Sequence, residues 1–200
     1  GFIFRSLRVT RKQKIIIELY DKFFRNAFPR MTERLGIVYT PVEVVDFIIY
    51  SVNEILQKEF QQTLGSKNVH ILDPFTGTGT FITRLLQSGL IDKKQLSYKY
   101  KNEIHANEIV LLAYYIAAIN IEAVYHDIMQ TDEYIPFSGI CLTDTFQMHE
   151  KDDLISDMLA NNSDRRKKQK KLDIRVIISN PPYSAGQDNA NDNNQNLKYP

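Results

Sequence analysis

Two short turns carry the residues best suited to chemistry, and each interrupts an apolar segment. The first is "DPFTGTGTF", Asp73 to Phe81, which follows "VHIL"; the second is "NPPY", Asn180 to Tyr183, which follows "RVIIS". An apolar strand, a glycine-rich turn and a helix form a unit that binds anions or nucleotides, because glycine lets the backbone come close and the helix N-terminus offers free N–H groups. The second turn has two consecutive prolines, neither of which can donate a backbone hydrogen bond.

The glycine turn departs from both common phosphate-binding patterns. A dinucleotide fingerprint needs a third glycine three residues after Gly79, where Ile82 stands, and a phosphate loop needs a lysine, which is absent between Asn68 and Lys93. A turn that sets the Asp73 carboxylate against the ligand favours a cationic or neutral ligand. S-adenosylmethionine carries a sulfonium, an ammonium and no phosphate. Glu108, which closes the second predicted strand, suits the two hydroxyls of a ribose. The alternatives that involve no ligand are a helix or turn cap for Asp73 and an exposed strand end for Glu108.

The proline turn predicts a pocket for an amino group. Proline forces the preceding residue to be extended, so Asn180, Pro181 and Pro182 form a stiff ledge. Neither proline can donate, so their carbonyl oxygens and the Asn180 side-chain oxygen make an acceptor-rich pocket. An exocyclic amine on a purine is a weak nucleophile, since its lone pair is delocalised into the ring. Two acceptors that hold both N–H bonds favour the tetrahedral geometry in which that lone pair can attack a methyl group. Tyr183 adds a flat face for a planar ring. The alternative is an ordinary turn at the end of a strand.

Helices and strands alternate along the chain, which predicts an α/β fold with a mostly parallel sheet. We expect helices over residues 11–28, 41–60, 80–87, 110–124 and 150–171, and strands over 69–73, 102–109, 140–142 and 173–179. Thr40, Pro41 and Glu43 have the spacing of a capping box with proline at the first helical position. Ligands collect beyond the carboxyl ends of parallel strands. Asp73, Glu108, Asp144 and Asn180 would all lie there.

Bulk composition narrows the class of protein. The chain of 200 residues has 25 basic and 24 acidic residues, so binding to nucleic acid would depend on local patches. The basic run Arg165–Lys171 is read as a solvated helix end, with a nucleic-acid contact as the alternative.

The single cysteine, Cys141, excludes an internal disulfide framework and a cysteine-cluster metal site, and no metal is expected. No apolar run is long enough to span a bilayer, which favours a cytoplasmic location with no membrane partner. We read the chain as a piece of a longer protein.

The two turns together resemble the amino-methyltransferase family that methylates adenine N6 in DNA. "DPFTGTGTF" looks like its cofactor loop, "NPPY" looks like its catalytic motif, and the order, with "GIVYTPVEVVDFI" first, is similar to the gamma arrangement. The resemblance implies a truncated Rossmann-like sheet and S-adenosylmethionine as cofactor. It implies that Asp73 lies near the methionine ammonium, Glu108 at the ribose and Asp144 by the adenine ring. The cofactor-binding residues it implies are Tyr39, Thr40, Pro41, Asp73, Pro74, Phe75, Thr76, Gly77, Gly79, Thr80, Glu108, Ile109 and Asp144; the catalytic ones are Asn180, Pro181, Pro182 and Tyr183.

A longer stretch, "KIIIELYDKFFRNAFPRMTERLGIVYTPVEVVDFII", resembles the coupler and methylase start of large single-chain restriction-modification enzymes, in which a nuclease and a helicase precede the methyltransferase. The resemblance implies a helical coupler over 1–35, a methyltransferase domain over 36–184 and a polar tail over 185–200. It implies DNA and the upstream helicase and nuclease as partners, and an isolated fragment without activity. Three alternatives stay open: methylation of a glutamine amide in release factors or of a base in ribosomal RNA by the same motif, and a non-catalytic nucleotide-binding coupling module of a helicase-containing protein.

Overall fold

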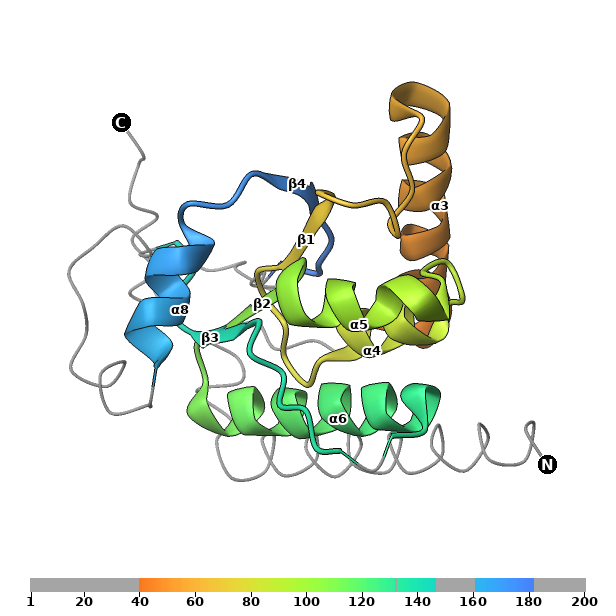
Figure 1. The fold of residues 1–200 in the computed structure, drawn as a ribbon. Helices are drawn as coiled ribbons and strands as arrows, with labels where there is room; N and C mark the ends of the chain where they lie inside the picture. Colours follow the sequence, from red (N-terminus) through yellow and green to blue (C-terminus); the bar gives the residue numbers. More distant parts are fainter. Residues whose placement is uncertain (1–39, 132, 147–160, 182–200) are drawn as a thin grey trace, which may run out of the picture.

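A four-stranded parallel sheet forms the centre of the molecule (Figure 1). The computed structural model describes residues 40–131, 133–146 and 161–181. The strands are β1 (His70–Asp73), β2 (Ile104–Glu108), β3 (Ile140–Leu142) and β4 (Ile174–Ile177), and the helices are α3 (Val42–Phe60), α4 (Thr80–Gln87), α5 (Lys93–Asn102), α6 (Leu111–Met129) and α8 (Asn162–Gln169). The predicted α/β class and the parallel pairing are therefore confirmed.

The strand order is β3-β2-β1-β4, so the order along the sheet reverses at β1. In the ladder, Asp73 lies beside Ala106 of β2, and Leu72 lies beside Ile177 of β4. In open parallel sheets a crevice forms outside the carboxyl ends of the strands at such a reversal. The reversal here lies between β1 and β4, and the two chemical turns begin next to each other at the carboxyl ends of these strands.

The helices cover both sides of this sheet. The buried core joins Ile104 and Ala106 of β2 to side chains of α3, α4 and α6. His105 and Cys141, which alternate with those core positions, border a small cavity against α8. Period-two alternation along a strand sends successive side chains to opposite faces, so α8 covers the second face.

Several predicted elements need correction in detail. The helix predicted from Pro41 begins at Val42, and Pro41 itself is the N-cap residue with no capping side chain. The predicted capping box is therefore wrong: the Pro41 carbonyl accepts hydrogen bonds from Val44 and Val45 N–H, while the Thr40 hydroxyl bonds elsewhere. The helix after β2 runs to Met129, beyond the predicted residue 124.

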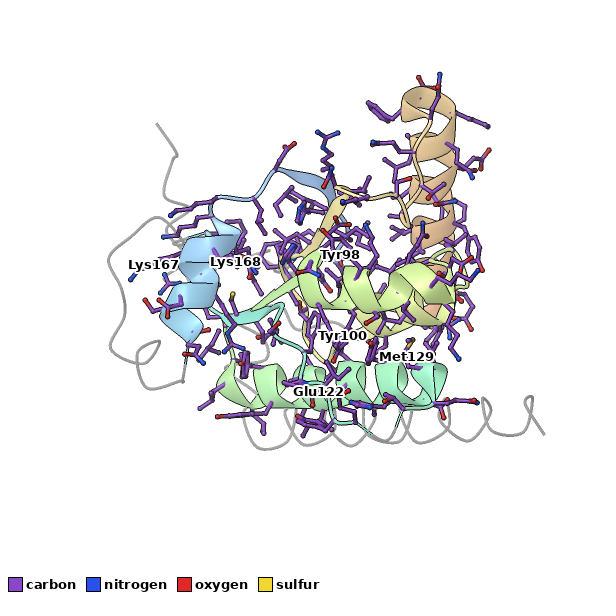
Figure 2. The ribbon with its side chains drawn as sticks, in the orientation of Figure 1. Tyr98, Tyr100, Glu122, Met129, Lys167 and Lys168 are labelled. Atoms are coloured by element: carbon purple, nitrogen blue, oxygen red, sulfur yellow. The ribbon has the colours of Figure 1, made fainter. Side chains whose placement is uncertain are left out.

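The prediction of a solvated end for the basic run is only partly correct. Lys167 and Lys168, labelled in Figure 2, are exposed, but Arg166 in the same helix is buried. The helix predicted over 150–171 corresponds in its second half to α8; residues 150–160, the helix predicted over 11–28 and the tail over 185–200 lie outside the described residues.

Helix α5 is an element that the sequence patterns did not indicate. Its sequence, "KKQLSYKYKN", is too polar to show an apolar stripe, but Leu96, Lys99 and Tyr100 are buried. Asp92 caps it by accepting a hydrogen bond from Lys94 N–H at 2.9 Å. Tyr100 points into the space between α5 and α6 (Figure 2) and stacks on Tyr125, with 3.7 Å between ring centroids.

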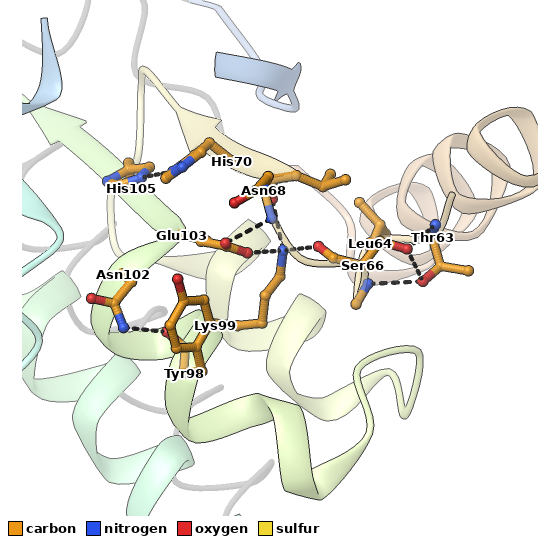
Figure 3. A network of polar contacts seen from close by, with 12 residues as sticks. Thr63, Leu64, Ser66, Asn68, His70, Tyr98, Lys99, Asn102, Glu103 and His105 are labelled. Carbon is orange, nitrogen blue, oxygen red and sulfur yellow. Dashed lines mark hydrogen bonds and ion pairs between the residues drawn. The ribbon is translucent and has the colours of Figure 1, made fainter. Parts of the chain in front are cut away.

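A buried ion pair fixes α5 to the loop before β1 (Figure 3). The Lys99 ammonium donates to Glu103 Oε2 at 2.8 Å and to the carbonyls of Ser66 and Val69 at 3.0 and 2.7 Å. The other Glu103 oxygen accepts from Asn68 N–H at 2.8 Å. Because these partners satisfy both charges, the pair can stay buried, and it sets the position where β1 enters the sheet.

Candidate functional site

The glycine turn starts at Asp73, the last residue of β1. Asp73 Oδ1 accepts a hydrogen bond from Phe75 N–H at 3.2 Å and a second one from the Ser179 hydroxyl at 2.6 Å. The turn-cap alternative thus describes one oxygen of this carboxylate. The other oxygen, Oδ2, is buried and has no hydrogen-bond partner.

Electrostatics at Asp73 are governed by burial, because the side chain is fully buried. Desolvation raises the pKa of Asp73 to about 7, with the neighbouring Glu108 charge acting in the same direction, while the bonds from Ser179 and Phe75 oppose the rise. A buried carboxylate with one unpaired oxygen attracts a cation, such as an ammonium group. The Asp73 carboxylate therefore suits the cationic S-adenosylmethionine and is unsuited to a phosphate.

Gly77 and Gly79 have left-handed backbone conformations, with φ of +56° and +87°. A Cβ on Gly79 would lie 3.2 Å from the Ile121 side chain and 3.3 Å from the Ala117 carbonyl, so this glycine lets the turn pack against α6. A Cβ on Gly77 would meet nothing within 4 Å. Gly77 therefore borders open space, where a ligand can approach the backbone.

Glu108, at the end of β2, is bound to the same turn. Its Oε2 accepts from Gly77 N–H at 2.7 Å, and its Oε1 accepts from Val110 N–H at 2.8 Å. The side chain is only 7% exposed, so it is not an exposed strand end. Burial raises the pKa of Glu108 to about 7, against the backbone hydrogen bonds that lower it. Each carboxylate oxygen has a further lone pair, which leaves the group able to accept from a hydroxyl.

The segment after β3 also contacts the glycine turn, through Thr145 and Phe146. Thr145 donates its hydroxyl to the Pro74 carbonyl at 2.7 Å, and the Phe75 and Phe146 rings lie 5.2 Å apart. Asp144 is half-buried and accepts a hydrogen bond from Phe146 N–H at 2.9 Å. Three strand ends therefore contribute residues around the Asp73 turn.

The proline turn joins this group through two side-chain hydrogen bonds. Besides the bond from Ser179 to Asp73, the Asn180 side-chain amide donates from Nδ2 to the Thr40 hydroxyl at 3.0 Å. That bond uses an N–H of the amide, so Asn180 Oδ1 is left as the acceptor. Thr40 lies two residues before the start of α3, and its partner lies 140 positions later in the chain.

The remaining predicted site residues lie as follows. Pro74 and Thr76 are buried, and the Thr76 hydroxyl donates to the Asp73 carbonyl at 2.9 Å. Thr80 begins α4 and is half-buried, whereas Ile109, Pro41 and Pro181 are exposed. Tyr39, Pro182 and Tyr183 lie outside the described residues, and their roles stay predictions.

Sequence reasoning missed Ser179, Thr145 and Asn120 as members of this group. Asn120 of α6 donates from its side chain to the Thr78 carbonyl at 3.0 Å and so supports the glycine turn. Ser179 had a usable signal, since a small hydroxyl residue between an apolar strand and Asn180 must lie at the carboxyl edge. Thr145 and Asn120 had none, because their partners are distant in sequence.

The described part of the chain contains neither a cluster of three or more His, Cys, Asp or Glu residues that could hold a metal ion nor a helix long and apolar enough to cross a membrane. A small cavity lined by residues such as Lys101, His105 and Gln169 lies against α8. It borders the starts of β2 and β3, away from the strand ends that carry Asp73 and Glu108.

Several solved structures contain chains similar to this one, and they include the following three. The ATP-dependent Type ISP restriction-modification enzyme LlaBIII bound to DNA is 55% identical with a TM-score of 0.77, and the match covers 90% of this chain and 12% of that one. A nuclease-deletion mutant of the Type ISP enzyme LlaGI in complex with a DNA substrate mimic is 53% identical with a TM-score of 0.78, covering 95% and 16%. The DrdV–DNA complex is 47% identical with a TM-score of 0.82, covering 92% and 18%. The chain thus spans less than a fifth of these proteins.

A comparison with curated proteins gave no match. The model of the N-6 DNA Methylase family matches residues 11–199, which is nearly the whole chain. The likeness to the solved structures confirms the predicted methyltransferase type of α/β sheet. The chain accordingly belongs to the N-6 DNA Methylase family.

Proposed function

We propose that this chain is the first part of the catalytic domain of an adenine-N6 DNA methyltransferase, within the modification module of a restriction-modification enzyme. The observation that carries the proposal is the meeting of the two turns: Ser179 lies 2.6 Å from the Asp73 carboxylate, and Asn180 lies 3.0 Å from Thr40. A methyl transfer requires the donor and the acceptor amine side by side, and these bonds place the predicted cofactor turn next to the predicted amine pocket.

The Asp73 turn would hold S-adenosylmethionine, which supplies an activated methyl group when bound. The unpaired Asp73 Oδ2 would face the methionine ammonium, and the open side of Gly77 leaves room for the ligand along the backbone. Glu108 would take the ribose hydroxyls while it keeps its bond to Gly77 N–H. Asp144 and Phe146 would border the adenine of the cofactor, and Tyr39, Thr40 and Pro41 its methionine end.

At the other turn, Asn180 Oδ1 and the Pro181 carbonyl would accept the two N–H bonds of the target amine. This grip would free the nitrogen lone pair for attack on the methyl group that S-adenosylmethionine would supply when bound. The amine would release one proton as it gains the methyl group, so the product would be a neutral N6-methylated adenine. Tyr183 would stack on the base after it is flipped out of the duplex, which offsets a few kcal/mol of lost stacking.

The substrate and partners of the whole protein follow from its relatives. Two similar chains are described as Type ISP restriction-modification enzymes and were solved with DNA or a DNA mimic. We infer DNA as the substrate here, with upstream helicase and nuclease domains in the same polypeptide. We assign residues 36–184 to the methyltransferase domain, 1–35 to the coupler and 185–200 to a polar tail, and we expect the isolated fragment to be inactive.

The test is a methylation assay on the intact parent protein with labelled S-adenosylmethionine and DNA, ribosomal RNA and release factor offered in parallel. We expect label on DNA adenine only. Asn180→Ala should abolish transfer while it leaves cofactor affinity within a few fold, and Asn102→Ala, which removes a local helix contact, should change neither. Transfer to release factor or RNA alone would refute the DNA assignment, and full activity of Asn180→Ala would refute the proposed site.

A further inference from the structure

Ser179 is the residue that connects the two turns. It lies two residues after the end of β4 and donates its hydroxyl to Oδ1 of Asp73, a residue 106 positions earlier, at 2.6 Å. The distance is typical of O–H···O⁻ hydrogen bonds, which are stronger than those between neutral groups. Ser179 is half-buried and Asp73 is fully buried, so little water competes for this bond.

The bond is not needed to hold β4 in the sheet. The backbone after β4 is already tied to β1, because Ile178 N–H donates to the Leu72 carbonyl at 3.0 Å, one step further along the parallel ladder. The pairing of β4 with β1 therefore does not require the Ser179 hydroxyl. The hydroxyl acts on the Asp73 carboxylate.

We propose that Ser179 is a positioning residue, whose hydroxyl holds the Asp73 carboxylate ionised and turned so that its unpaired oxygen meets the ammonium group of the cofactor. The inference rests on the proposed use of S-adenosylmethionine. With Oδ1 occupied by Ser179 and Phe75 N–H, rotation of the carboxylate is blocked, and Oδ2 is left as the free acceptor. A cation that pairs with Oδ2 completes the coordination of an otherwise unsatisfied buried charge.

Ionisation is the part of this role that can be measured. Burial raises the pKa of Asp73 to about 7, the charge of Glu108 at the end of β2 adds to the rise, and the Ser179 hydrogen bond is the leading opposing influence. Glu108 is the charged group that faces Asp73 across the turn. Loss of the hydroxyl should therefore raise the pKa of Asp73, so that more of it is protonated and unable to attract an ammonium group at neutral pH.

The experiment measures the affinity of the intact parent protein for S-adenosylmethionine by calorimetry at pH 6.0 and 8.5, for the wild type, Ser179→Ala and Ser179→Thr. If the pKa of Asp73 rises by about one unit, Ser179→Ala should weaken binding about ninefold at pH 6.0 and less than about twofold at pH 8.5. Ser179→Thr keeps the hydroxyl and should restore wild-type affinity at both values. Ser97→Ala, a half-buried serine of α5, is the matched control.

A second ligand separates positioning from folding. 5′-Methylthioadenosine carries the nucleoside of the cofactor without the amino acid, so Ser179→Ala should leave its affinity equal to that of the wild type at each pH. A loss of affinity in Ser179→Ala that is equal for both ligands, or equal at both pH values, would overturn the proposal. Absence of S-adenosylmethionine binding in the wild type would instead overturn the proposed function.

Discussion

Replacement of Asp73 by asparagine offers a direct test of the electrostatics at the site. Asparagine has nearly the same shape, and its oxygen can still accept from Phe75 N–H and the Ser179 hydroxyl. What the substitution removes is a charge buried with one oxygen unpaired. We therefore expect Asp73→Asn to increase the stability of the protein without cofactor, and to do so more at high pH than at low pH.

The magnitude follows from the shift in pKa, from 3.8 to about 7. A carboxyl whose pKa is raised by folding binds its proton more tightly in the folded state, so its contribution to stability is greatest below pH 3.8 and is lost as the pH rises to 7. A shift of about three units corresponds to about 4 kcal/mol of lost stability at pH 8, and to about 1.5 kcal/mol at pH 5. The gain from Asp73→Asn should thus be about 2.5 kcal/mol larger at pH 8 than at pH 5.

Urea unfolding of both proteins, followed by far-ultraviolet circular dichroism and tyrosine fluorescence, measures this gain. The comparison uses the difference between the two proteins at each pH because other buried groups also titrate. Burial lowers the pKa of His105 to about 3, which destabilises the wild type and the variant alike as the pH falls from 6.5 toward 3. A difference in free energy of unfolding that is the same at pH 5 and pH 8 would refute the reasoning. The stabilised variant should bind S-adenosylmethionine far more weakly.

Two further predictions concern the frame of the site. Lys99→Met leaves the Glu103 carboxylate buried without its cation and should destabilise the protein by about 3–5 kcal/mol. The double variant with Glu103→Leu should lose much less stability than the sum of the two single variants. Strict additivity of the free energies in denaturant unfolding would contradict this coupling. Gly79→Ala places a Cβ against Ile121 at a position with a left-handed backbone. Gly77→Ala has only the conformational cost of about 1–2 kcal/mol, so Gly79→Ala should lower the melting temperature more. Equal melting temperatures of the two variants would show that the turn does not pack closely against α6.

Local patterns in the sequence were sufficient for the elements that have a strong signal. Short apolar runs that end next to Asp73 and at Leu142 indicated β1 and β3, because a strand buried on both faces needs nearly continuous apolar residues. Helix α5 was missed for the opposite reason. Its buried face contains Lys99, whose charge is satisfied only by Glu103 and by carbonyls of a distant loop.

Helix boundaries were less predictable than the helices themselves. Thr40, Pro41 and Glu43 have the spacing of a capping box, yet the Thr40 hydroxyl accepts from the Asn180 amide and α3 begins without a side-chain cap. A capping residue is chosen by local geometry only when no tertiary partner competes for its side chain. Here a partner 140 positions away occupies the hydroxyl.

The types of residue at the site were readable from the sequence, because the chemistry of a carboxylate, a left-handed glycine or a proline ledge belongs to the residue itself. The absence of a lysine from the glycine turn argued against a phosphate loop from the sequence alone. Tertiary structure alone decided which groups meet and in what state: the order β3-β2-β1-β4 sets the end of β4 beside the end of β1, and this adjacency brings Ser179 to Asp73. Burial at that edge of the sheet, and not the sequence around Asp73, raises the pKa of its carboxyl, since desolvation depends on every chain segment that packs around a group.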